Sequence, residues 1–285
     1  MPNLRSVLRM LRGHIADWLH SPRTLISGMV ILALTYMNAR NYAFLLESNE
    51  LYSHFGEAVF YYLSTGFGNI SLASALFLVM MSEVPRRTAY QNMMLIRANR
   101  IRWLLSQVVF CLMVTCLMMS LMLMLSMAMT WPHLVSGGGW SDLERIAMDP
   151  DAQWMVQLAP EYVRSISPFA ASIMAAAVLF AFWFTMVLVI LFCTLVGHPT
   201  LGLIVYISLL VLNITVLWEQ LPSWAQHMPA TFATMSAVAN KFSGRELASI
   251  PIVLLAYLGV DIVLIFSMYS KTRKIDLFFA GKDIA

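Results

Sequence analysis

The stretch SEVPRRTAYQNMMLIRANRIRWLLSQ, residues 82–107, is the most basic part of this 285-residue chain. It contains one acidic residue, Glu83, and lies between two long apolar runs. Its five arginines are Arg86, Arg87, Arg97, Arg100 and Arg102. Because an excess of basic residues marks the cytoplasmic side of a membrane protein, a charged connection between apolar runs indicates how the chain is oriented.

The composition of the chain is that of a membrane protein. Hydrophobic residues make up 60% and charged residues 12%, against roughly 45–50% and about 25% in soluble domains. A soluble fold of this length could not bury so much apolar surface, and several runs reach the roughly 20 residues needed to cross a bilayer. The sequence therefore predicts a polytopic membrane protein.

Six apolar runs are predicted to span the membrane, each as a helix, because backbone polar groups must be satisfied internally in lipid. They are residues 24–46, 58–81, 103–130, 168–196, 200–218 and 251–270. Only GHP, residues 197–199, separates the fourth and fifth runs, which predicts an antiparallel hairpin. The predicted fold is an all-α membrane protein with a single transmembrane domain over residues 1–285.

The basic residues gather on one predicted side. The N-terminal segment, the connection after the second run and the C-terminal tail hold four, five and four of the 18 Lys and Arg residues. Most acidic residues fall in the other connections. Both termini are therefore predicted to be cytoplasmic.

Residues 1–22 are predicted to form an amphipathic helix. Its apolar residues, spaced by three or four, are Leu4, Leu8, Leu11, Ile15 and Trp18. Its other face carries Arg5, Arg9, Arg12 and Asp17. A basic helix of this kind is expected to lie in the cytoplasmic interface; the alternative is a helix folded onto a soluble partner. SPR, residues 21–23, is predicted to end it.

The familiar enzyme motifs are absent from the sequence. It contains no P-loop, no H-E-x-x-H and no G-x-S-x-G. GFGNIS, residues 66–71, lacks the third glycine of a dinucleotide fingerprint and favours a close-packing or flexible point between helices. The chain is predicted not to be an enzyme, to bind no cofactor of its own and to have no nucleic-acid partner.

The 22 methionines permit two interpretations. Together with Cys111 and Cys116 in the third span, their thioethers are suitable ligands for Cu(I). However, the cysteines lack C-x-x-C spacing, and methionine is also a flexible apolar filler between helices. The second interpretation is favoured, and no metal site is predicted.

Asp261 lies near the middle of the sixth span, where a carboxylate costs roughly 2.5–3.5 kcal/mol. It is expected to face a cavity, a partner helix or a hydrogen-bond donor. One interpretation is a substrate or proton site. The other is a buried polar clasp, with Asn213 of the fifth span as the candidate partner.

The basic connection is predicted to contain a short helix parallel to the membrane, over residues 83–98. Tyr90, Met93, Met94 and Arg97 recur there at helical spacings. Its arginines can bind anionic lipid headgroups or acidic residues of a cytoplasmic protein. The Tyr–Met–Met ridge is typical of a helix that inserts into a groove.

The predicted interfacial N-terminal helix, the six spans, the cytoplasmic termini and the charged helix between the second and third spans together resemble the type-2 ABC exporter permease family. In that family an acidic residue, a short helix and the pattern LL-x-x-P-x-S-R lead into the third span. The matching positions are Glu83, Thr88 and MMLIRANRIRWLLSQ, residues 93–107. Asn99 and Arg100 stand where a Ser-Arg or Thr-Arg pair is usual, Gln107 stands where lysine is common, and the proline is missing.

The resemblance implies a permease subunit that works with a separate ATPase subunit, which binds ATP and Mg. A second copy of this chain, or a related permease, would complete the transporter in a bacterial cytoplasmic membrane. The implied ATPase-coupling residues are Glu83, Arg86, Arg87, Thr88, Tyr90, Met94 and Arg97. Residues 219–250 would form outer re-entrant gate helices. The expected cargo is hydrophobic or amphipathic, such as a peptide, lipid or drug; the alternative function is a secondary transporter that uses Asp261 and an ion gradient.

Overall fold

The computed structural model describes residues 4–54, 56–65, 67–82, 84–85, 100–135, 137, 139–141, 166–216 and 250–274. This part of the chain is mostly helical, as predicted. The helices are α1 Leu4–Leu19, α2 Pro22–Ser48, α3 Glu57–Thr65, α4 Phe67–Met81, α6 Arg100–Thr130, α9 Pro168–Val196, α10 Pro199–Val216 and α12 Ile250–Lys274, with a short 3₁₀ helix, η1 Trp131–His133. Two short parallel strands, β1 Ser53–His54 and β2 Leu134–Val135, pair with each other.

Three helical segments of the described chain are long and apolar enough to cross a membrane. They are Arg100–His133, Pro168–Val196 and Ile250–Thr272, which cover the predicted third, fourth and sixth spans. Two shorter apolar segments, Ser71–Met81 and Thr200–Leu209, fall inside the predicted second and fifth spans. The fold agrees with a helical membrane protein.

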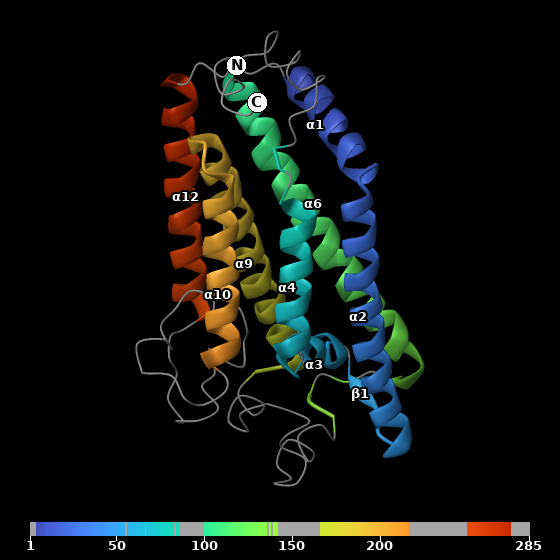
Figure 1. The fold of residues 1–285 in the computed structure, drawn as a ribbon. Coiled ribbons are helices and arrows are strands. Elements are labelled where there is room, and N and C mark those ends of the chain that lie inside the picture. The colour runs from blue at the N-terminus through green and yellow to red at the C-terminus, as the bar shows by residue number, and fades with distance from the viewer. Residues whose placement is uncertain are drawn as a thin grey trace.

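Helix α9 is the centre of the bundle. Helices α3, α6, α10 and α12 pack against it, while α2 packs against α4 and α6. Figure 1 shows the long helices side by side. The starts of α1 and α6 and the end of α12 lie at one end, and the end of α2, β1 and α3 lie at the opposite end.

Residues next to each end of α9 explain where this helix begins and ends. Ser167 precedes it in an extended conformation and accepts a hydrogen bond from the Ala170 amide, and Pro168 occupies the first turn, where its missing N–H is not needed. At the other limit Gly197 has φ +95°, and the His198 amide donates to the Cys193 carbonyl at 2.9 Å. This is a Schellman ending. The hairpin predicted between α9 and α10 is confirmed.

The predicted second span is two helices in the structure. Residues 58–81 were expected to form one helix, but α3 ends at Thr65 and α4 begins at Phe67. Figure 1 shows α3 crossing the lower end of α4 instead of continuing its line. Gly66 and Gly68 lie at the break, and each glycine costs about 1 kcal/mol in a helix interior. The GFGNIS motif thus coincides with a change of helix direction.

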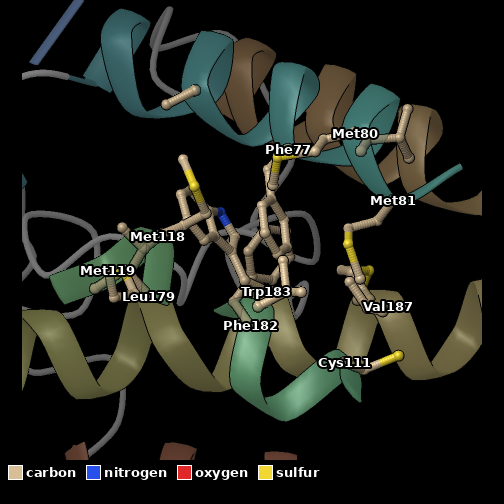
Figure 2. Packing of buried hydrophobic residues seen from close by; sticks show 14 of the residues in the cluster. Phe77, Met80, Met81, Cys111, Met118, Met119, Leu179, Phe182, Trp183 and Val187 are labelled. Carbon is tan, nitrogen blue, oxygen red and sulfur yellow. The ribbon is translucent and has the colours of Figure 1, made fainter. Parts of the chain in front are cut away.

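Aromatic and sulfur-containing side chains fill the space between α4, α6 and α9. Phe77 stacks on Trp183 with ring centroids 4.3 Å apart, and the Trp183 indole donates to Ser74 Oγ at 2.8 Å. Figure 2 shows Met80, Met81, Met118 and Met119 around this pair. These methionines act as apolar filler between helices.

Helix α1 packs against α6. It ends where Ser21 turns extended and Pro22 starts α2, as the SPR pattern predicts. The face predicted to meet lipid is divided: Leu11 and Trp18 are buried, whereas Leu8 is 53% exposed. Part of this apolar face is thus covered by the chain itself.

Candidate functional site

The predicted coupling residues lie outside the described part of the chain. They are Glu83, Arg86, Arg87, Thr88, Tyr90, Met94 and Arg97. What the structure does show is where their connection leaves and re-enters the bundle. Helix α4 ends at Met81 and α6 begins at Arg100, both at the end where α1 starts (Figure 1).

The described charges are sorted by sign between the two ends of the bundle. The described cations near the end where α1 and α6 start and α12 finishes are Arg9 and Arg12 on α1, Arg100 and Arg102 in the first turn of α6, and Lys271 in the last turn of α12. The acids Glu47 and Glu50 at the end of α2 and Glu57 at the start of α3 belong to the opposite end. Asp17 on α1, Arg40 on α2 and the buried Asp261 within α12 are exceptions, and Arg23 lies in the first turn of α2. Arg40 donates a long 3.4 Å hydrogen bond to the Tyr36 hydroxyl. The sorting places the basic connection at the more cationic end.

A buried polar cluster joins α1 to α6. His14 Nε2 lies 3.2 Å from Ser106 Oγ and 3.1 Å from the Gln107 amide nitrogen. Burial lowers the pKa of His14 from 6.5 to about 4, and the Asp17 carboxylate partly opposes this shift. His14 is therefore neutral at neutral pH, and Nε2 can accept a hydrogen bond from the Gln107 amide.

The sequence interpretation missed His14, although a local signal was available. His14 lies three residues after Leu11 and four before Trp18, so it shares their face of the helix. Its partners on α6 are more than 90 residues away in sequence and have no local signal.

Asp261 takes part in a buried hydrogen bond between α9 and α12. The Thr185 hydroxyl donates to Asp261 Oδ1 at 2.7 Å, and Asp261 is only 7% exposed. Of the three surroundings expected for this carboxyl group, the structure shows a hydrogen-bond donor. The donor is Thr185 of α9; Asn213 lies on α10, with its side chain outside the described set.

A second buried carboxyl group, Glu57, lies at the opposite end of the bundle from the basic connection. Its Oε2 accepts hydrogen bonds from Ser53 Oγ at 3.0 Å, the His54 amide at 3.1 Å and Ser141 Oγ at 2.5 Å. Its Oε1 accepts from the Ser141 amide at 2.6 Å. We call Ser53, His54, Glu57 and Ser141 the Glu57 cluster.

In the sequence, Glu57 is one of the acidic residues outside the three basic segments. One of its contacts is local, because the His54 amide that donates to it lies three residues earlier. Ser141 lies 84 residues after Glu57, so no pattern of neighbouring residues could predict this contact.

The cysteines are free thiols, with Cys111 and Cys193 buried and Cys116 exposed. Across the described ranges, no three His, Cys, Asp or Glu side chains come together in a metal-binding group.

No protein-family model, curated protein or solved structure matches this chain.

Proposed function

We propose that this chain is the transmembrane subunit of a type-2 ABC exporter, with six spans and with both termini and the connection of residues 82–99 in the cytoplasm. ATP and Mg would be bound by a separate ATPase subunit. The observation that carries the proposal is the site of the basic connection. It joins α4 to α6 at the bundle end where α1 begins, α12 ends and the described cations gather.

Physical arguments support this orientation and role. Lys and Arg accumulate in short cytoplasmic connections, so the cationic end is the cytoplasmic one. A helix presenting arginines beside a Tyr–Met–Met ridge suits a groove on an acidic protein partner. In the proposed exporter this helix, residues 83–98, transmits movement of the ATPase to the bundle. Residues 219–250 would act as an outer gate, and a second permease copy would complete the pathway.

The cargo we propose is hydrophobic or amphipathic, such as a peptide, lipid or drug. The predicted third and fourth spans are rich in methionine and phenylalanine and offer apolar surfaces of this kind. Such surfaces adapt to varied apolar partners.

A secondary transporter is the second candidate, and one observation favours it. Asp261 is a buried acid in the middle of an apolar helix, with the hydroxyl of Thr185 on a neighbouring helix as its partner. Ionisable groups at this depth often mark ion or proton paths. The hydrogen bond from Thr185 is equally expected if Asp261 only holds α9 and α12 together. The secondary transporter is therefore the weaker candidate.

The deciding experiment is a pull-down of the intact protein from its native membrane in mild detergent. The variant R86A/R87A/Y90A/R97A removes three arginines and one tyrosine from the proposed coupling helix. The matched control, R40A/R145A/R164A/Y162A, removes the same residue types from positions predicted at the outer side. We expect an ATPase of ABC type to co-purify with the wild type and the control, and not with the coupling-helix variant.

Two results would contradict the proposal. Absence of an ATPase from every sample, with transport driven by a proton gradient, would favour the secondary transporter. Equal recovery of the ATPase with both variants would mean that residues 83–98 do not form the contact between the permease and the ATPase.

A further inference from the structure

The Glu57 cluster contains a carboxylate with protein donors at both oxygens, three at Oε2 and one at Oε1. Glu57 is fully buried, and its oxygens accept four hydrogen bonds, from Ser53, His54 and twice from Ser141. An ionised carboxylate offers about four lone-pair sites and donates nothing. The hydrogen bonds therefore match the charged form of the side chain.

No described cation pairs with Glu57; all four bonds come from neutral donors. Hydrogen bonds to a charged acceptor are roughly twice as strong as those between neutral groups. The other titratable groups near Glu57 are His54 on β1 and Tyr42 on α2, and the Tyr42 ring packs against Tyr61 of α3. The Tyr42 hydroxyl lies 3.1 Å from Ser53 Oγ, and His54 Nδ1 lies 3.1 Å from the Val135 carbonyl oxygen. Helix α9 contributes Phe169 and Ser172 to this region, neither of which titrates.

The residues beside Ser141 are tied to the same end of the bundle. The Trp140 indole donates to the Ile166 carbonyl at 2.6 Å and packs edge-on against Phe60 of α3. On the other side of the cluster, Gly56 has φ +101°, and a Cβ there would lie 3.0 Å from the backbone of Phe169. The start of α3 thus lies close against the start of α9, and Glu57 connects the start of α3 to Ser141.

We propose that Glu57 is a positioning residue whose negative charge holds residues 139–141 against the start of α3. A glutamine of the same size does this less well, because it has one acceptor oxygen in place of two. In either orientation its amide NH₂ group faces a backbone N–H donor, that of His54 or that of Ser141. One end of the connection between α6 and α9 is released as a result, while the helices remain folded. This inference does not depend on the exporter proposal, since it concerns local order within one chain.

The test is hydrogen exchange, measured by mass spectrometry on the full-length protein in mild detergent. In Glu57→Gln we expect the amides of His54 and Ser141 to exchange about 10-fold faster or more, because charge-assisted bonds contribute roughly 1.5–3 kcal/mol. Ser141→Ala removes only the hydroxyl donor and should accelerate the same amides by roughly threefold. Ser74→Ala is the matched control, since it removes a buried hydroxyl from the Trp183 contact and should leave both amides at the wild-type rate.

Glu57→Gln separates charge from shape, because glutamine has nearly the same size as glutamate and carries no charge. Wild-type protection of the His54 and Ser141 amides in Glu57→Gln would overturn the proposal, as would a uniform rise in exchange across all helices. If Glu57→Gln fails to fold, an absence of local change in Ser141→Ala also overturns it.

Discussion

Three buried polar side chains show how single residues are accommodated in this apolar bundle. Asp261 accepts a hydrogen bond from a threonine hydroxyl, Glu57 accepts bonds from four donors, and His14 lies against a serine and a glutamine. An unpaired polar group in such surroundings costs roughly 1–3 kcal/mol. Each of these residues therefore requires its partner on another element, and each contact fixes how two elements meet.

His14 leads to a prediction about pH at the contact between α1 and α6. Its pKa is lowered to about 4 when buried, against 6.5 when exposed. Between these values the exposed imidazole binds a proton that the buried one does not, so the stability of the docked state falls as pH falls from 6.5 towards 4. The full effect is at most roughly 3 kcal/mol. Thermal unfolding in detergent across this pH range should show a steeper loss in the wild type than in His14→Gln.

The control for this measurement is His20→Gln, at the residue that follows α1. His20 is exposed and its Nδ1 lies 2.7 Å from the Ala16 carbonyl oxygen, so its replacement should leave the wild-type pH response intact. An unchanged response in His14→Gln would assign the acid sensitivity to another group.

At the scale of elements, local signals account for both ends of α9 and for the junction between α1 and α2. Ser167, Pro168 and Gly197 delimit α9 at the predicted residues 168–196, and Ser21 with Pro22 separates α1 from α2. The exception is the break between α3 and α4, where the apolar run is continuous in composition. Its glycines were recognised as a packing point, but the change of direction depends on where α9 and α10 lie.

The ending of α9 provides a prediction for one element. Gly197→Ala should destabilise the protein by about 1–2 kcal/mol, since φ +95° is strained for a residue with a Cβ. Gly259→Ala on α12 is the matched control: its Cβ would meet nothing within 4 Å, and alanine is the better helix former. Thermal unfolding in detergent should rank Gly259→Ala at or above the wild type and Gly197→Ala below it. The reverse order would contradict the assigned role of Gly197.

At the scale of the whole molecule, the distribution of charge predicts the orientation in the membrane. Helix α2 ends at Ser48 and α12 ends at Lys274, at opposite ends of the bundle (Figure 1). The acids near Ser48 and the cations near the end of α12 predict that these ends face opposite sides of the membrane, with the cations inside.

Labelling in intact cells tests this orientation. With Cys116, the exposed thiol, replaced by serine, a membrane-impermeant thiol reagent should modify Ser48→Cys directly. It should modify Lys271→Cys only after the membrane is permeabilised. Equal labelling of both positions in intact cells would mean that the ends are not separated by the membrane as predicted.

The amino-acid sequence by itself determined the class of the protein, the approximate helices and the segregation of charge. These properties depend on composition, on runs of about 20 apolar residues and on caps read over a few positions. The tertiary structure alone decided which helix packs on which. It paired Asp261 with Thr185, and it brought Glu57 to Ser141 and His14 to Gln107. The physical reason is that these partners are 76 to 93 residues apart in sequence, and in a chain so uniformly apolar many helix pairings would bury similar surface.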